Sequence, residues 1–189
     1  MNESTDVEDR RVAIIHAVWH VIGEQGMGAV SMRTVAGAAG VSVGRIQYWF
    51  RTKDELLRAS LEAMLSGAAE RHDTATTDVD DRDKLWHLIS HPIPQADSSP
   101  AGVSVFHQYV AAGINHPALA AILADAQDGA ENEAVRLLHR ICPGGRDQRT
   151  AARTLIATAH GLAMRVLICN PDVADAERVL RAEVDRVTG

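Results

Sequence analysis

The sequence predicts an all-α fold. Hydrophobic residues make up 46% of the 189 residues but aromatic residues only 4%, and the abundance of Ala, Leu and Val favours helices over sheets. Apolar positions recur at steps of three and four residues, and no stretch shows the alternation of a strand-rich protein. The length suits one large domain or a small domain joined to a larger one.

The first helix is expected over residues 10–25. Its apolar side chains recur every three or four positions along one face: Ile15, Val18, Trp19 and Ile22. Residues 1–9 are polar, and we expect them to fray. A tryptophan on the apolar stripe of a small helical domain usually packs into the core, so Trp19 is assigned there rather than to a ligand site.

A short helix is expected over residues 32–39. Ser31 is a suitable N-cap, and Gly40 suits the left-handed conformation that often ends a helix. Val41 follows the glycine and is expected to enter the core between this helix and the next. The chain is therefore predicted to turn sharply at Gly40.

A second short helix is expected from its N-cap Ser42 to Phe50. Ile46 and Phe50 lie four residues apart on one face, which we expect to be buried. The other side chains of this helix are expected to point outward: Val43, Gly44, Arg45, Gln47 and Tyr48. Such an outward set suits a DNA groove.

A long helix is expected to begin near Lys53, because Thr52 is a third N-cap and Glu55 completes a capping box. Residues 72–81 and 91–100 break the apolar pattern and are predicted to be loops. The remaining helices are expected over these ranges: 82–90, 101–114, 118–141, 147–169 and 173–187. Pro143-Gly144-Gly145 and Asn170-Pro171 are the breakers expected between the last three.

Positive charge is concentrated in the segment that carries the two short helices. The whole chain has a net charge of −6, but residues 10–60 hold seven basic and three acidic residues, which is +4, so the remainder carries −10. Phosphates respond to the field at the contact surface rather than to the total charge. A basic segment on an acidic body therefore favours local DNA binding.

Arg45 and Gln47 are expected to read bases, because Arg pairs with guanine and Gln with adenine in the major groove. Val43 is suited to a thymine methyl group. Four residues are expected at phosphates: Ser31, Ser42, Tyr48 and Lys53. The serines and the lysine lie at helix starts, where free N–H groups favour anions. Arg33 suits either role. The alternative is that Arg45 and Gln47 are simply solvated.

The run Ser-x-x-x-Val-Ala-x-x-Ala-Gly-Val-Ser-x-Gly-x-x-x-Tyr-Trp-Phe-x-x-Lys-x-x-Leu, from Ser31 to Leu56, resembles the DNA-binding domain of TetR-family transcriptional regulators. It departs mildly from the family pattern at Ser31, Val35 and Trp49. Gly44 and Trp49 are included in the expected DNA-contact set.

The resemblance implies a DNA-binding domain over residues 1–54 and a helical ligand-binding and dimerisation domain over residues 55–189. It also implies a homodimeric repressor that is released from palindromic operator DNA by a small molecule and that needs no cofactor. The run Ala-His-Gly-Leu-Ala-Met-Arg-Val-Leu, with a His-Pro pair before an earlier helix, resembles the subgroup that includes choline-responsive repressors. This similarity is too generic to name the effector.

The last two helices are expected to form the dimer interface, as the resemblance also implies. The helix over 147–169 has an unusually small-residue surface that allows close approach of a second helix. The residues assigned to the interface are Thr154, Ala157, Thr158, Gly161, Leu162 and Val184. Packing within one subunit is the alternative for this surface.

A ligand pocket in the C-terminal domain is expected to use apolar walls and a few polar groups. The side chains assigned to it are Trp86, Phe106, Tyr109, His160 and Met164. Each of them taken singly also fits a plain core position.

Two rival functions have some support in the sequence. The chain has nine histidines, and His87 and His91 are four residues apart, a spacing that can chelate a metal, so a metal-responsive sensor is one alternative. Thiolates or carboxylates at ligand spacing are lacking nearby, and no metal site is assigned. Residues 40–44 match Gly-x-Ser-x-Gly of serine hydrolases, yet a helix rather than a strand precedes Ser42, so no catalytic residue is assigned.

Cys142 and Cys169 are widely separated and are expected to be packed thiols. No secretory segment is evident, and no apolar run is expected to span a bilayer. The protein is therefore expected to be cytoplasmic, with no membrane partner.

Overall fold

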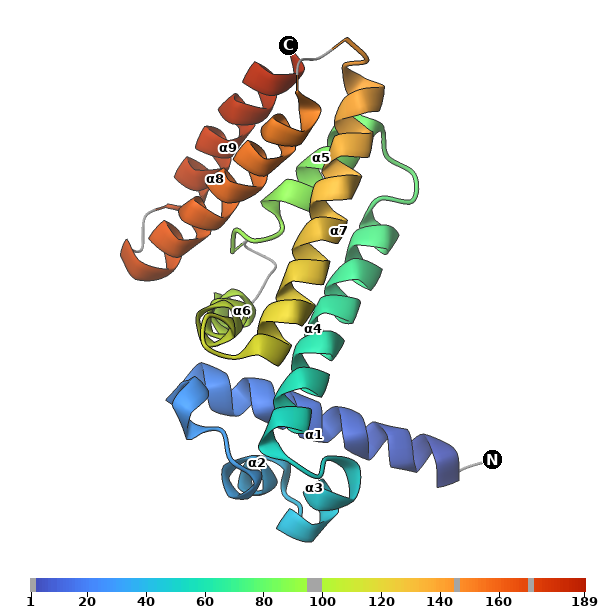
Figure 1. The fold of residues 1–189 in the computed structure, drawn as a ribbon, viewed down its shortest axis with the longest axis vertical. Coiled ribbons are helices and arrows are strands. Elements are labelled where there is room, and N and C mark those ends of the chain that lie inside the picture. Colours follow the sequence, from blue (N-terminus) through green and yellow to red (C-terminus); the bar gives the residue numbers. More distant parts are fainter. Residues whose placement is uncertain (1–2, 95–99, 145–146, 170–171) are drawn as a thin grey trace. The chain divides into compact units, whose positions relative to one another are not determined.

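The computed structural model describes residues 3–94, 100–144, 147–169 and 172–189, and these ranges are mostly helical with no strand (Figure 1). Their elements are α1 (Glu3–Gln25), the 3-10 turn η1 (Met27–Ala29), α2 (Met32–Ala39), α3 (Val43–Trp49), α4 (Lys53–Ala75), α5 (Asp81–Ser90), α6 (Pro100–Gly113), α7 (Pro117–Ile141), α8 (Gln148–Cys169) and α9 (Val173–Thr188). The predicted all-α fold is confirmed.

Most predicted helix ends lie within one or two residues of the observed ones, and α2 coincides with its prediction. The start of α1 differs, because the helix begins at Glu3 and residues 3–9 are not frayed. Gly145, the Asn170-Pro171 pair and residues 95–99 of the predicted 91–100 loop lie outside the described residues.

The end of α4 also differs, because the helix continues to Ala75 and only the later part of the predicted 72–81 loop is non-helical. The hydroxyl of Thr74 donates to the carbonyl of Glu70 at 2.8 Å, and that of Thr76 donates to the carbonyl of His72 at 2.8 Å. The bond of Thr74 to the preceding turn satisfies its hydroxyl inside α4, whereas Thr76 lies just beyond the end of the helix. The threonine-rich composition alone therefore does not mark a loop here.

By packing, the chain divides into two compact units. The first consists of Met1–Gly67 with Ser104–Leu123, and the second of Ala68–Val103 with Ala124–Gly189. The first unit thus includes α6 from Ser104 onward and the first turns of α7. The functional division expected at residue 54 is a separate prediction.

The core of the first unit is built largely on α1. The buried residues that α1 contributes are Ile14, Ile15, Ala17, Val18, Val21 and Ile22. Trp19 packs at the edge of this core, as predicted, and its Nε1–H donates to the carbonyl of Ser60 at 3.0 Å. The Ser60 hydroxyl lies 2.6 Å from that of Tyr109, and burial raises the pKa of Tyr109 to about 12. The indole of Trp19 and the hydroxyls of Ser60 and Tyr109 are therefore paired.

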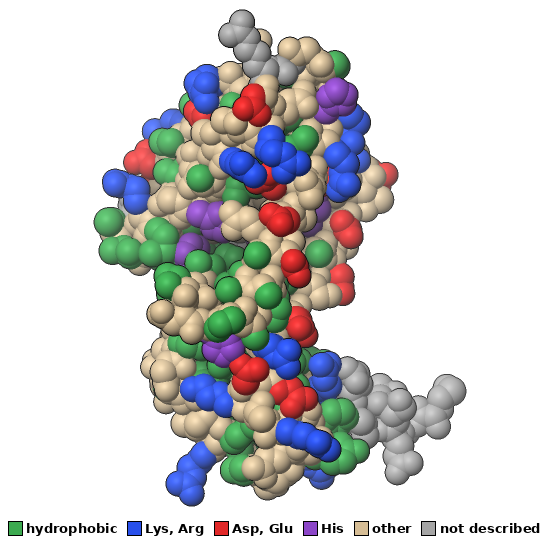
Figure 2. All heavy atoms as spheres, viewed as in Figure 1, with side chains coloured by type: hydrophobic (Ala, Val, Ile, Leu, Met, Phe, Trp, Pro, Cys, Tyr) green, Lys and Arg blue, Asp and Glu red, His purple; other side chains and the backbone are tan. Residues whose placement is uncertain are grey.

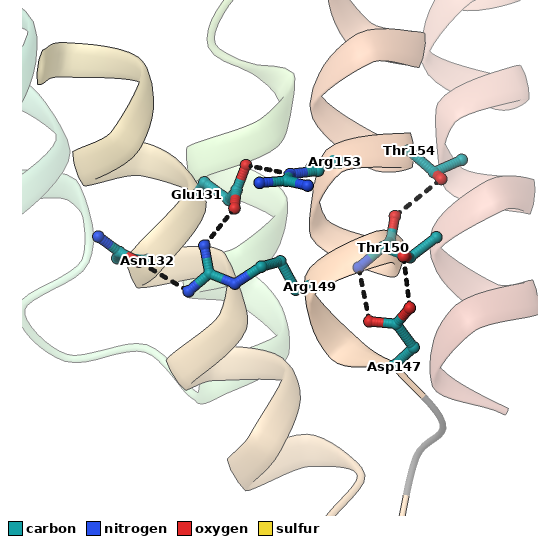
Figure 3. Close-up of polar contacts among 7 residues, drawn as sticks. All are labelled: Glu131, Asn132, Asp147, Arg149, Thr150, Arg153 and Thr154. Atoms are coloured by element: carbon teal, nitrogen blue, oxygen red, sulfur yellow. Dashed lines mark hydrogen bonds and ion pairs between the residues drawn. The ribbon is translucent and has the colours of Figure 1, made fainter. Parts of the chain in front are cut away.

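The core of the second unit joins α5, α7, α8 and α9. Its buried residues include Leu85, Ile89, Leu137, Leu138, Leu155, Ala159 and Leu180. Polar contacts also link α7 to α8: Glu131 accepts hydrogen bonds from Arg149 and Arg153, the latter at 2.8 Å (Figure 3). These guanidinium groups, Arg153 first, hold the pKa of Glu131 below its usual range.

By length and composition alone, α8 is long and apolar enough to cross a bilayer, contrary to the expectation that no segment is. Six of its residues are nevertheless buried in the second unit: Ala152, Leu155, Ile156, Ala159, Ala163 and Val166. Core helices of soluble proteins meet the same test, so this property of α8 is weak evidence for a membrane.

Candidate nucleic-acid interface

The turn between α2 and α3 has the predicted chemistry. The Ser31 hydroxyl accepts a hydrogen bond from the N–H of Thr34 at 3.1 Å and caps α2, while Thr34 completes a capping box. Gly40 adopts a left-handed conformation (φ 65°, ψ 29°) that a side chain would strain. Ser42 then caps α3 by accepting from the N–H of Arg45 at 3.2 Å. The two helices are thus held as a helix-turn-helix by local sequence.

One face of α3 is anchored and the other is presented to solvent. Ile46 is fully buried and Phe50, just after the helix, is 2% exposed, as predicted. The outward set is exposed, with Tyr48 at 75%: Val43, Gly44, Arg45, Gln47 and Tyr48. A buried anchor beneath an exposed face fixes the direction of the side chains expected to read bases.

The start of α4 is capped slightly differently from the prediction. The hydroxyl of Thr52 accepts from the N–H of Glu55 at 3.0 Å, as expected, but the Glu55 carboxylate accepts from the N–H of Arg51 at 2.8 Å rather than from that of Thr52. Lys53 is exposed in the first turn, where an anion is favoured by the helix dipole.

Acidic groups near this surface are engaged in contacts of their own. Asp54 pairs with Arg58 at 3.3 Å and lies 2.7 Å from Nε2 of His116, and Glu55 serves the cap of α4. Basic and acidic side chains are interspersed on the visible face that carries α1 to α3 (Figure 2). Arg33, Arg45 and Lys53 are exposed, so their charges are accessible to phosphate or base edges.

Trp49 differs from its neighbours because it is half-buried and packs against the core of the first unit. Its ring meets Tyr48 edge-on, with ring centroids 5.2 Å apart. The indole N–H is buried and has no hydrogen-bond partner among the described residues. Little of this side chain is therefore presented to solvent in comparison with Tyr48.

The residues expected to line a ligand pocket are divided between the two units. Trp86, His160 and Met164 belong to the second, and Phe106 and Tyr109 to the first. Tyr109 is fully buried against Ser60. The guanidinium carbon of Arg181 lies 3.7 Å from the centroid of the Trp86 ring, so one face of this tryptophan is already covered by a cation.

The residues expected at a dimer interface fall into three groups. Ala157 and Gly161 are exposed; Thr154, Thr158 and Leu162 are half-buried. The Thr154 hydroxyl donates to the carbonyl of Thr150 within α8 (Figure 3). Val184 is only 8% exposed in the core of its own unit, which leaves little of it for a partner.

Three large apolar side chains of α8 and α9 were missed by the sequence analysis. Ile168 is 73% exposed and Val179 is 53% exposed, and Met164, which had been assigned to the ligand pocket, is also exposed. Periodicity could not separate these side chains from buried ones on the same helices. Their exposure in the structure is the signal, because exposed large apolar side chains can mark a protein interface.

The histidines and cysteines show no concerted arrangement. No group of three or more His, Cys, Asp or Glu within the described ranges is placed to hold a metal ion. Cys142 is half-buried and its thiol donates to the carbonyl of Thr188 at 3.1 Å. Cys169 is exposed, so the expectation of a packed thiol is wrong for it; its position at the end of α8 explains this.

Comparison with known proteins gives the family context. Residues 14–60 match the model described as bacterial regulatory proteins, tetR family, and residues 81–189 match that of the BetI-type transcriptional repressor, C-terminal. The chain is 28% identical over 185 residues to the HTH-type transcriptional regulator BetI of Pseudomonas aeruginosa, covering 93% of this chain and 90% of that protein.

Two further relatives bear on the fold. The chain is 30% identical over 112 residues to the HTH-type transcriptional regulator PksA of Bacillus subtilis, an alignment that spans 59% of this chain and about half (55%) of PksA. A Saccharomonospora viridis protein crystallised in complex with choline has the same fold, with a TM-score of 0.85 and 22% identity over 94% of this chain and 96% of that one.

Proposed function

Since the chain belongs to the TetR family of DNA-binding transcriptional regulators, with a C-terminal part of BetI type, we propose that it acts as a homodimeric repressor on a palindromic operator. One observation carries the proposal: α3 is capped at Ser42, anchored by buried Ile46, and exposes Arg45 and Gln47. In a helix-turn-helix this second helix enters the major groove.

Base reading and phosphate binding are assigned to different side chains. Arg45 and Gln47 read bases and Val43 contacts a thymine methyl. Phosphate contacts come from Ser31, Ser42, Tyr48 and Lys53, and Arg33 serves either role. Gly44 allows close approach of the DNA. Trp49 supports the edge of this surface through its edge-on contact with Tyr48.

A pair of variants separates these two roles. Arg45→Ala should weaken binding to the specific site by about 1–3 kcal/mol and blunt base preference at one position. Lys53→Ala should weaken all duplexes alike and reduce the salt slope of binding by about one. Fluorescence anisotropy on the operator and on a scrambled duplex measures both, and unchanged base preference in Arg45→Ala would remove it from the reading set.

The homodimer is proposed to use exposed small and apolar side chains of α8 and α9. Ala157 and Gly161 supply close approach, and Met164, Ile168 and Val179 supply the apolar area. A two-fold dimer of this kind places one reading helix on each half of a palindrome. The cytoplasm is its proposed location.

The proposed effector is a mostly apolar small molecule that binds within residues 55–189 and favours the form that does not fit the operator. Choline is the natural first probe, because it was crystallised with the Saccharomonospora viridis protein. Quaternary ammonium groups bind aromatic faces. In this chain Arg181 covers one face of Trp86, so a ligand that uses that face has to displace the guanidinium.

Thermodynamic reciprocity tests this effector role. A coupling of about 1–3 kcal/mol changes affinity 5- to 150-fold, and operator DNA must weaken the effector by the same factor as the effector weakens DNA. Calorimetric titration of choline into the free protein and into its operator complex measures the factor. Equal affinity in both titrations would show that choline is not an inducer, and unchanged choline affinity in Trp86→Ala would refute the assigned pocket.

A further inference from the structure

A side chain from outside the helix-turn-helix holds the connection that leads into it. Gln108 of α6 donates from Nε2 to the carbonyl of Ile22 at 3.0 Å, and its Oε1 accepts from the N–H of Met27 at 2.8 Å. These partners lie 86 and 81 residues earlier in the chain, and all three residues belong to the first unit. One amide thus bridges the end of α1 and the start of η1.

The connection requires such a partner because local sequence does not supply one. Gly26 separates α1 from η1 with φ 83° and ψ 163°, a conformation essentially restricted to glycine. Glycine has no side chain with which to cap η1, and no side-chain cap is formed there. The first N–H groups of a helical turn need an acceptor from elsewhere, and Gln108 provides it for Met27.

Hydrogen bonds continue from η1 into α2. The hydroxyl of Thr34, in the first turn of α2, donates to the carbonyl of Ala29 at 2.8 Å. The N–H of Ser31 donates to the same hydroxyl at 2.9 Å. The position of the first turn of α2 is therefore tied to η1, and that of η1 to Gln108. Because buried Val35 of α2 and Ile46 of α3 share one core, α3 follows α2.

We propose that Gln108 is a positioning residue for DNA reading. Its amide fixes the α1–η1–α2 connection and so holds α2 and α3 in the orientation that fits the operator. An amide is required because one atom must donate and another accept. Glutamate keeps only the acceptor when ionised, and methionine keeps the shape but neither bond.

The neighbouring residue on α6 offers a matched control. Tyr109→Phe removes a buried hydrogen bond to Ser60 in the same core but leaves both bonds of Gln108 in place. The two variants Gln108→Met and Tyr109→Phe therefore both lose polar contacts of α6, and only the first loosens the connection into α2.

The experiment uses the full chain and its operator, with binding of the wild-type protein to that operator as the reference. Amide exchange of Met27 reports the contact directly. Fluorescence anisotropy with the operator measures specific DNA affinity, and with a scrambled duplex it measures general DNA affinity. Gln108→Met should speed Met27 exchange and lower operator affinity about tenfold, since it loses two bonds, with scrambled-duplex affinity unchanged. Gln108→Glu should have a Met27 exchange rate and an operator affinity between those of the wild type and Gln108→Met. Tyr109→Phe should leave Met27 exchange and operator affinity at the wild-type level.

Any of four results would overturn the proposal. Continued protection of Met27 in Gln108→Met would show that the contact is not formed in solution. If Gln108→Met lowers affinity equally for the operator and the scrambled duplex, or lowers neither, Gln108 only stabilises the fold. A loss of operator preference in Tyr109→Phe as large as in Gln108→Met would assign the effect to core stability rather than to the connection.

Discussion

Gly44 occupies an exposed position in α3 where nothing within the described chain requires a glycine. A Cβ added there would meet Ser42 Oγ at 3.9 Å, an ordinary contact, and the backbone does not have a positive φ. An exposed helical glycine costs about 1 kcal/mol relative to alanine. Close approach of another surface is the remaining physical reason for it, and on α3 we propose that this surface is DNA.

Gly44→Ala should therefore raise the free energy of unfolding by about 0.5–1 kcal/mol while lowering operator affinity. Gly129→Ala is the matched control, because Gly129 is also helical and exposed, with open space where the new methyl group would lie. It should gain similar stability and bind operator normally. Chemical denaturation and anisotropy give the two quantities; equal operator affinity in both variants would leave Gly44 without a role at the DNA.

At the scale of elements, the helix ends set by local chemistry were predicted from sequence. Ser31, Gly40 and Ser42 each need only a neighbour within a few residues, so the α2–α3 unit followed from its spacing. The extra turn of α4 was missed because the helical bond of Thr74 competes with the loop tendency of the same residue. Gln108 and the Arg181–Trp86 pair depend on residues far apart in sequence, and no pattern in one chain reveals such contacts.

The link between α7 and α8 predicts a pH dependence of stability. Because Arg153 and Arg149 lower the pKa of Glu131, its contribution is present above the ordinary carboxyl pKa of about 4.3 and is lost as pH falls through the lower folded value. Glu131→Gln should flatten the acid side of the stability profile. Glu133→Gln is the control, because Glu133 pairs with Arg136 of its own helix. Identical acid profiles for the two variants would contradict the link.

At the scale of the whole molecule, the dimer is expected to depend on exposed apolar side chains of the second unit. Ile168→Glu should give monomers at concentrations where the wild-type protein is dimeric, because a charge in a desolvated interface is costly. Its side chain is 73% exposed, so the subunit itself should stay folded. Ile114→Glu is the control, at 80% exposed in the first unit, and should remain dimeric. Light scattering measures the molar mass of each variant in solution. A dimeric Ile168→Glu variant would place the interface elsewhere.

The most direct test of the account is a hydroxyl-radical footprint on the DNA that flanks the gene of this protein. Two protected half-sites related by a two-fold axis are predicted, with centres roughly 34–36 Å or a multiple of that apart. Arg45→Ala should relax base preference at one position in each half-site. A single unpaired protected patch, or an Arg45→Ala footprint with undiminished base preference, would contradict operator reading by α3 of a two-fold dimer.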